Sequence, residues 1–297
     1  MQSRHWLHLG ALFLLLFVNT TYAVTLTDDR GRKITLGHPP GRIVSLAPHV
    51  TELLYAIGAG DMLVGADEYS DYPGPAAQLP RIGNASRVDI ERVLSLEPDL
   101  VIGWLTGNAE SDISKLEKLG IPVFVTEITS LDNVAQQLIR LGRLTGKSVK
   151  AKEVAAGYRH RLQELRAQYA EKPRISVFYQ VWEQPLMTVN GRHFISDAIQ
   201  LCGGNNVFSK LQTLAPILSK EAVIAADPQA IISGRTPGND TSLQLEWGSW
   251  QSMGAVKYDN LFTIPSDLIA RPTTRILDGV AMICEALDEA RRHMHAR

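Results

Sequence analysis

Two stretches of the chain, DIERVLSLEPDLVIG (residues 89–103) and SKEAVIAADPQAIISG (residues 219–234), follow one pattern. In each, a glutamate stands seven positions before a proline, and the apolar run after the proline ends near a glycine. The two glutamates are Glu91 and Glu221. The pattern predicts, twice, a short helix with a glutamate in its first turn, a proline that ends the helix, and a buried strand.

The repeated glutamate has two explanations. A carboxylate in the first turn of a helix is favourable for the helix dipole by about 0.3–1 kcal/mol, which alone would account for it. Alternatively, two similar lobes each present one carboxylate to a partner that is itself two-fold symmetric.

Apolar strand-like segments alternate with helical segments along most of the chain. This alternation indicates βαβ units and mainly parallel sheets, which is the α/β fold class. The predicted strands are 42–47, 62–69, 100–104, 122–127, 174–182, 230–234 and 261–267. The predicted helices are 50–60, 90–96, 111–120, 132–146, 193–204, 219–226 and 273–293.

The alternation stops once, between residues 147 and 171, where a long, charged, helical segment stands without a strand. We therefore expect two Rossmann-like lobes with parallel-rich sheets, joined by a long rigid helix. The expected division is an N-terminal lobe over residues 24–146, the connecting helix over 147–171 and a C-terminal lobe over 172–297.

Residues 1–23 have the features of a secretory signal peptide. A short basic region precedes the apolar run LHLGALFLLLFV, and small residues follow, so that cleavage is expected after Ala23. A membrane anchor is the weaker alternative, because the apolar run is shorter than the ~20 residues of a membrane span. With no cysteine at the cleavage site, we expect an exported, periplasmic protein without a lipid anchor.

The composition is that of a globular protein with a packed core, with 297 residues, 45% hydrophobic residues and a net charge of −1. No cluster of Lys and Arg indicates a nucleic-acid surface. The two cysteines, Cys202 and Cys284, would form a disulfide in an oxidising compartment, closing a loop of about 80 residues and adding roughly 4 kcal/mol. Two buried free thiols are the alternative.

Motifs of catalysis are scarce. The chain has no G-x-S-x-G elbow and no Walker loop, and the glycines of IGAGDMLVG (57–65) are out of register for a dinucleotide site. His49 follows a predicted strand, where a ligand could lie, although a polar loop residue is the simpler interpretation. We expect no metal site, since the histidines are scattered and His293 and His295 belong to a solvated helix end.

Aromatic side chains are expected at strand ends and in loops. In open α/β sheets, ligands bind beyond the carboxyl ends of the strands, and flat rings suit a large, partly apolar ligand. Half-buried packing is the alternative role for each ring. The side chains concerned are Tyr69, Tyr72, Trp104, Trp182, Trp247 and Trp250.

The segment RIVSLAPHVTELLYAIGAGDMLVGADEYSDYP (42–73) resembles the periplasmic substrate-binding proteins of ABC importers for iron-siderophores, haem and vitamin B12. The resemblance extends to residue 287 and is most specific for the vitamin B12 (cobalamin) branch. The motifs that carry it are SDYP (70–73), ERVLSLEPDLVIGW (91–104), GNAE (107–110), QYAEKP (168–173), CGGNNVF (202–208) and SDLIARPTTRIL (266–277).

The resemblance implies roles for individual residues. Glu91 and Glu221 match two glutamates at the lobe tips that dock onto arginines of the membrane permease dimer. Tyr69 and Trp104 match aromatic residues that contact the corrinoid, and residues 267–271, with Asp267 and Arg271 at their ends, match a ligand-contacting loop. The two cysteines match a disulfide of the C-terminal lobe.

The chain departs from this family at several pocket positions. Two tryptophans of known members fall at Ala85 and Ala215, and a pocket phenylalanine falls near Met187. Trp182, or Trp247 together with Trp250, would have to replace the missing ring surface. These departures affect the identity of the ligand more than the fold.

From the residues and the resemblance together, we expect a monomeric, two-lobed binding protein that carries a corrinoid to an ABC importer, without a cofactor or covalent chemistry. The lobes should move little on binding. A haem or ferric-siderophore binding protein of the same fold is the first alternative. An extracytoplasmic enzyme that uses Asp67, Asp71 or Asp267 as its acid–base groups is the second.

Overall fold

The computed structural model describes residues 23–235 and 243–296. The predicted signal peptide therefore lies outside the described residues, apart from Ala23. Within the described part of the chain, no helix is both long enough and apolar enough to cross a membrane.

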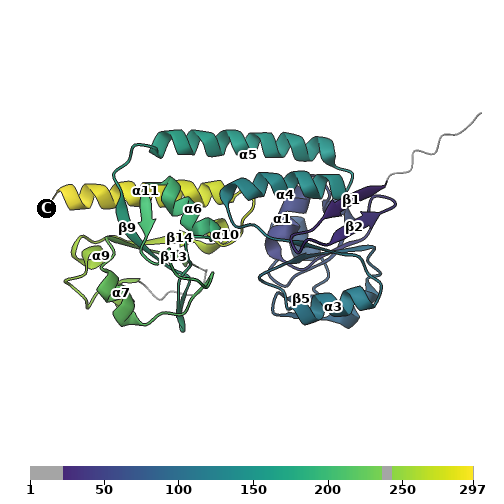
Figure 1. Ribbon diagram of the computed structural model, residues 1–297, viewed down its shortest axis with the longest axis horizontal. Helices are drawn as coiled ribbons and strands as arrows, with labels where there is room; N and C mark the ends of the chain where they lie inside the picture. The colour runs from purple at the N-terminus through teal and green to yellow at the C-terminus, as the bar shows by residue number, and fades with distance from the viewer. Residues whose placement is uncertain (1–22, 236–242, 297) are drawn as a thin grey trace, which may run out of the picture.

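Two four-stranded parallel sheets form the centres of two lobes (Figure 1), which confirms the predicted α/β class. The strands of each sheet have the same order, with the first strand between the second and the third, and the fourth at the far edge. The first sheet consists of β4 (Leu63–Ala66), β3 (Ile43–Ser45), β7 (Leu100–Trp104) and β8 (Val123–Thr126). The second consists of β12 (Gly204–Asn206), β9 (Ile175–Gln180), β13 (Ala230–Arg235) and β14 (Leu261–Pro265).

The repeated sequence pattern occupies the same place in both lobes. Helix α2 (Ile90–Ser95) and helix α7 (Lys220–Ala226) each connect the second strand of their sheet to the third. Each is followed by an acidic residue of positive φ directly before the proline: Glu97 at 46° and Asp227 at 40°. The two stretches are thus topological equivalents, as the repeat predicted.

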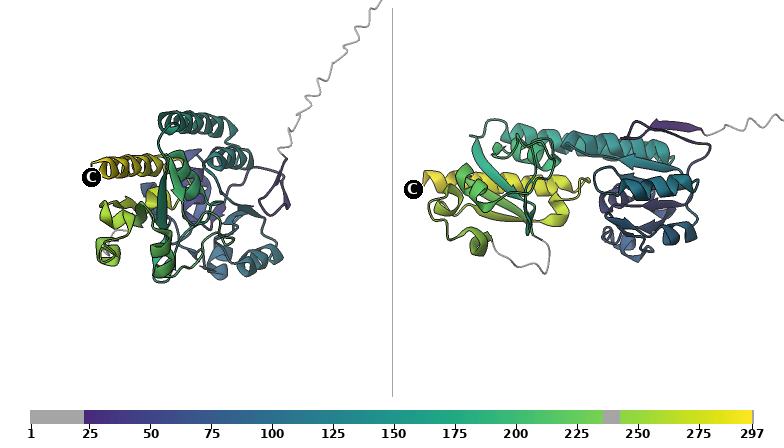
Figure 2. Two further views of the ribbon diagram at one scale, coloured as in Figure 1. Left: turned by 60° about the vertical axis from the view of Figure 1, so that its left-hand side comes forward. Right: turned by 60° about the horizontal axis from the view of Figure 1, so that its bottom comes forward.

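Helix α5 (Ser148–Tyr169) lies along both lobes, and Figure 2 shows it beside each of them. Its buried side chains recur at every third or fourth position, and the Tyr158 hydroxyl donates to the Leu131 carbonyl oxygen at 2.9 Å. It packs against α4 (Leu131–Leu144) of the first lobe and against α6 (Phe194–Leu201) and α11 (Ile276–His295) of the second. A continuous apolar cluster runs through these helices into both lobes.

Helices α6 and α11 are also joined by the Cys202–Cys284 disulfide, which confirms the predicted bridge. Among the described residues, three small antiparallel hairpins and strand β12 were not predicted, because strands of two to four residues are too short to show a clear pattern. The hairpins are β1–β2 (Val24–Thr27 and Lys33–Leu36), β5–β6 (Gly83–Asn84 and Arg87–Val88) and β10–β11 (Trp182–Glu183 and Leu186–Met187).

Candidate functional site

The carboxyl ends of the strands in the first sheet carry the residues that the sequence pointed to. Tyr69 lies in the loop that follows β4, and Trp104 is the last residue of β7. Strand β3 leads into α1 (Pro48–Ala56), which carries His49 and Glu52. Contacts from Arg271 of the second lobe reach this edge, so that the two lobes face each other here.

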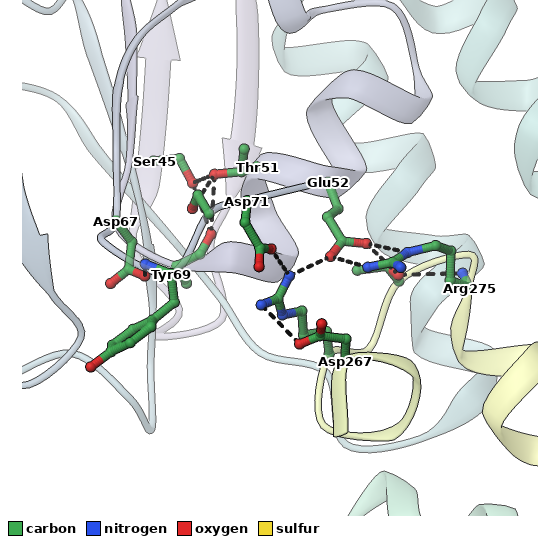
Figure 3. Close-up of polar contacts among 12 residues, drawn as sticks. Ser45, Thr51, Glu52, Asp67, Tyr69, Asp71, Asp267 and Arg275 are labelled. Atoms are coloured by element: carbon green, nitrogen blue, oxygen red, sulfur yellow. Dashed lines mark hydrogen bonds and ion pairs between the residues drawn. The ribbon is translucent and has the colours of Figure 1, made fainter. Parts of the chain in front are cut away.

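A dense set of hydrogen bonds shapes the loop that presents Tyr69. The fully buried Asp67 accepts the backbone N–H of Tyr69 on Oδ1 at 2.8 Å (Figure 3). Arg81 donates from Nη1 to the carbonyl oxygens of Asp67 at 3.0 Å and of Ser70 at 2.9 Å. The hydroxyls of Thr51 and Ser70 lie 2.9 Å apart. A fixed backbone therefore carries an aromatic side chain that is itself 60% exposed.

Asp67 is an unusual carboxyl group in this loop. Burial raises its pKa to about 6, even though the hydrogen bond from Tyr69 N–H acts in the opposite direction. Its Oδ2 atom has no hydrogen-bond partner among the described residues. A buried carboxyl group that titrates near neutral pH is typical of functional sites, although structural networks also produce such groups.

Trp104 and His49 pack against each other beside this loop. Their rings meet edge to face with centroids 5.3 Å apart. The Trp104 indole N–H donates to Glu127 Oε1 at 3.3 Å, and the Trp104 side chain is half-buried. Burial lowers the pKa of His49 to about 4, and the positive charge of Arg271 acts in the same direction. His49 is therefore a neutral, buried ring, not the loop residue expected from the sequence.

A buried ion network joins the two lobes at this edge. The Glu52 carboxylate accepts from Arg275 Nη2 at 2.7 Å and from Arg275 Nε at 3.0 Å (Figure 3). It also accepts from Arg271 Nη1 at 3.1 Å and from the Thr273 hydroxyl at 3.1 Å. The Glu52 side chain is 3% exposed. All four bonds come from a five-residue segment of the second lobe.

Two further carboxylates, both more exposed than that of Glu52, belong to the same network. Arg271 Nη1 lies 2.6 Å from Asp71 of the first lobe, and Arg271 Nη2 lies 3.0 Å from Asp267 in α10 (Ser266–Ile269). Burial alone would raise the pKa of Asp71, but the hydrogen bond and charge of Arg271 outweigh it and hold this pKa below its ordinary value. The guanidinium of Arg275 lies over the Tyr72 ring, 3.7 Å from its centroid.

In the second lobe, the structure brings Trp182 and Met187 together. They are cross-strand partners in the β10–β11 hairpin, where Trp182 is 64% exposed and Met187 is half-buried. Of the two positions where the sequence lacks an expected tryptophan, Ala85 lies between β5 and β6 and Ala215 precedes α7, and both are partly exposed.

The suggestion that Trp247 replaces a missing pocket ring is wrong. Trp247 is the last residue of α8 (Leu243–Trp247) and is completely buried. Its indole N–H donates to Gln180 Oε1 at 2.8 Å, and its ring packs edge to face on Phe178. The partly buried Trp250 packs against it with ring centroids 5.8 Å apart. Trp247 is thus a core residue of the second lobe, and Trp182 remains the exposed ring.

Glu91 and Glu221 are both exposed in the first turns of their helices. Hydrogen bonds from its own backbone N–H and from the Ser219 hydroxyl hold the pKa of Glu221 below its ordinary value. A hollow of ≈ 590 Å³ adjoins Glu91 and is lined by β5, β6 and the start of α2. In Figure 1, β5 and α7 lie on the side of their lobes away from α5.

Sequence reasoning missed Glu52, Thr273 and Arg275 as members of the site. One signal was available: Glu52 stands in the helical run VTELLYA, beside the apolar and buried Val50, Leu53 and Leu54. A charged residue in such a place needs a buried partner. Within the described ranges 23–235 and 243–296, no group of His, Cys, Asp and Glu could hold a metal ion.

Comparisons with known proteins agree with this architecture. Residues 43–268 match the family model described as "Periplasmic binding protein". A relative named vitamin B12-binding protein, from Vibrio cholerae, is 37% identical over 255 residues, which cover 86% of this chain and 91% of that protein.

Solved structures show the same similarity. The crystal structure of the periplasmic vitamin B12 binding protein of Vibrio cholerae matches with a TM-score of 0.79 at 37% identity, covering 85% of this chain and 98% of that one. A periplasmic heme-binding protein from Roseiflexus matches with a TM-score of 0.74 at 23% identity, covering 84% and 98%. The match to the heme-binding protein, at 23% identity, shows a shared fold and no more.

Proposed function

The chain belongs to the periplasmic binding protein family, and we propose that it captures vitamin B12 or a related corrinoid between its lobes and delivers it to the permease of an ABC importer. One observation carries this proposal: the 37% identity to the vitamin B12-binding protein of Vibrio cholerae extends over 86% of the chain. A similarity over 86% of the chain includes most of both lobes, from which a site between them could be built.

The cargo site that we propose contains six residues. Tyr69 and Trp104 form the wall of the first lobe, and Trp182 with Met187 forms an apolar surface of the second lobe. Asp267 and Arg271 supply polar groups, and their ion pair faces the first lobe through Asp71. Exposed rings at 60% and 64% on a fixed backbone suit the face of a large macrocycle.

We propose no covalent chemistry for this site. Asp71 and Asp267, two of the three carboxyl groups considered for an enzyme, are both paired with Arg271. Asp67 is buried and holds the backbone of the Tyr69 loop. Selectivity would come from shape and from ring contacts. An activity that is lost in Asp67→Asn while cargo binding is kept would favour the enzyme alternative.

We further propose that Glu91 and Glu221 dock onto a permease dimer of the inner membrane. Both are exposed, and both occupy the same topological place in their lobes. In this proposal the mature protein is a periplasmic monomer with lobes over residues 24–146 and 172–297 and a connecting helix over 147–171. The signal peptide would be removed after Ala23.

The first test is calorimetric titration of the mature protein with cyanocobalamin and then with cobinamide. Tight binding of either at one-to-one stoichiometry is the expected result. It would also show that alanine is tolerated at positions 85 and 215, where the tryptophans of other members are missing. No heat with both corrinoids would contradict the proposal, and titration with haem and a ferric siderophore would then decide between the alternatives.

A further inference from the structure

We propose that Glu52 is a positioning residue for the cargo site. Its carboxylate would hold the 271–275 segment of the second lobe against α1 of the first, so that Arg271 and the angle between the lobes are set before cargo arrives. This inference rests on the proposed function, because it assigns Glu52 a role in binding without contact between Glu52 and the cargo.

Each oxygen of the Glu52 carboxylate accepts two hydrogen bonds. Oε1 accepts from Arg271 at 3.1 Å and from Arg275 at 2.7 Å, whereas Oε2 accepts from Arg275 at 3.0 Å and from Thr273 at 3.1 Å. Arg275 therefore binds both oxygens, the two-point geometry that gives the strongest and most directional ion pairs. A buried pair contributes little net stability but fixes one arrangement, because breaking it leaves an unpaired buried charge.

The other carboxylates of the network are poorly suited to this role. The side chain of Asp71 is 60% exposed and that of Asp267 is 47% exposed, against 3% for Glu52. Exposed ion pairs are screened by water and salt and contribute little. The ion pair of the Asp71 carboxylate is with Arg271, so its loss leaves the Arg275 attachment in place.

The same network reaches the loop of the proposed cargo tyrosine. Arg275 lies over the ring of Tyr72, three residues after Tyr69 in the loop that Asp67 and Arg81 hold. One carboxylate thus links, through Arg275 and Arg271, the backbone that carries Tyr69 and the segment that contains Asp267. The distance between the two proposed walls of the site depends on Glu52.

The contacts of Glu52 add an attachment between the lobes that helix α5 does not provide. Helix α5 attaches the lobes along one side, where α4 of the first lobe also contacts α6 of the second and the Leu131 N–H donates to Asp197 Oδ2 at 2.8 Å. In this proposal, these attachments alone would leave the angle between the lobes adjustable. A second attachment through α1 and the 271–275 segment removes this freedom. Apo protein would then already have the competent geometry, and cargo would bind without the loss of affinity that a minor competent state imposes.

The test uses Glu52→Gln in the mature protein, which keeps the shape of the side chain but turns its carboxylate neutral and one acceptor into a donor. If the competent geometry falls to about a tenth of the population, affinity for the corrinoid that binds wild type falls about 10-fold. Small-angle scattering should show a larger radius of gyration for the apo variant than for apo wild type, returning to the wild-type value on saturation with that corrinoid.

Asp132→Asn is the matched control, since it removes an exposed carboxylate from an ion pair with Arg166 between α4 and α5. Its affinity and radius of gyration should stay at wild-type values. If Glu52→Gln does not fold, Arg275→Lys provides the second variant, because it keeps the charge and loses the two-point contact. It should change both quantities in the same direction by a smaller amount.

Wild-type affinity and an unchanged apo radius of gyration in the folded variant would overturn the proposal. A lowered melting temperature with both quantities unchanged would also overturn it, since that result assigns Glu52 a purely structural role. If wild type binds no corrinoid, the proposed function fails, but the comparison of the apo radii still decides whether Glu52 fixes the lobes.

Discussion

The helices that carry Glu91 and Glu221 connect equivalent strands of their lobes, but the residues beside the two glutamates pack on different surfaces. In the first lobe, Asp89 caps α2, and Ile90 packs onto the apolar cluster beneath the sheet. In the second, Ser219 caps α7, and the Lys220 ammonium lies 5.6 Å from the ring centroid of Trp247 and 3.9 Å from Glu246.

This difference shows which part of the repeated pattern the fold requires. The route from helix to strand needs an N-cap, a turn of positive φ and a proline, and both lobes have all three. The residue beside the glutamate is free to be apolar or charged, because each lobe packs it on a surface of its own. A two-fold symmetric permease would therefore meet two acids with the same backbone and unlike surroundings.

The largest effect is expected from loss of the disulfide, which links two helices of the second lobe. The first lobe has no disulfide among the described residues. Replacing both Cys202 and Cys284 by Ser should lower the free energy of unfolding by about 4 kcal/mol, because the bridge closes a loop with a sequence separation of 82. Hydrogen exchange resolved by lobe checks this, with faster exchange expected in α6 and α11. An equal increase in both lobes would show that the lobes unfold as one unit.

Acidification should weaken both lobes, because each carries a histidine at the start of its first helix, buried in the case of His49 and partly buried in the case of His193. Burial lowers the pKa of His49 and of His193 to about 4 from 6.5. Between these values the unfolded chain binds more protons, so stability is full above about pH 6.5 and is lost as pH falls. The expected loss is about 2 kcal/mol per histidine from pH 7 to pH 5.

Asp67 acts in the opposite direction, since burial raises its pKa to about 6 and its ionised form is the costly one. Protonation below pH 6 should offset about 1 kcal/mol of the loss. Urea unfolding at pH 5 and pH 7 measures the balance. His49→Leu should make the loss smaller, whereas His160→Ala, at a 76% exposed position of α5, should leave it unchanged. A slope unaffected by His49→Leu would contradict this account.

A smaller effect is expected on docking. Glu91→Ala and Glu221→Ala should each weaken binding to the purified permease about 10-fold, or about 1.4 kcal/mol, with cargo affinity unchanged. Surface plasmon resonance and calorimetry measure the two quantities. Glu153→Ala, in an exposed ion pair on α5, is the control that should affect neither. Equal loss of cargo binding would place the two acids in the site or in the fold.

The smallest effect concerns the caps. Asp89→Ala and Ser219→Ala should each cost about 1 kcal/mol, because each removes the acceptor for one backbone N–H. Exchanging the caps, with Asp89→Ser and Ser219→Asp, should change stability by less than about 0.5 kcal/mol. Chemical denaturation measures both sets. A large loss on exchange would mean that the two helix starts are not equivalent.

Much of the fold was visible in the sequence, because helices and parallel strands leave local periodic patterns. The parallel sheets and the disulfide followed from spacing or from composition, but strand β12 of the second sheet was not among the predicted strands. The hairpins β1–β2 and β5–β6 escaped notice, since two to four residues carry no period. The exposure of Trp247 was predicted wrongly, because the sequence does not show whether a tryptophan lies in a core or on a surface.

The sequence by itself determined the α/β class, the duplication of the lobes and the family, because each is a property of local pattern or of extended similarity. Only the tertiary structure decided how the lobes are held. Glu52 and Arg275 are 223 positions apart, and no local period connects them. Their ion pair forms because helix α1 of the first lobe and the segment before α11 of the second lobe meet, and a buried carboxylate there needs hydrogen-bond donors.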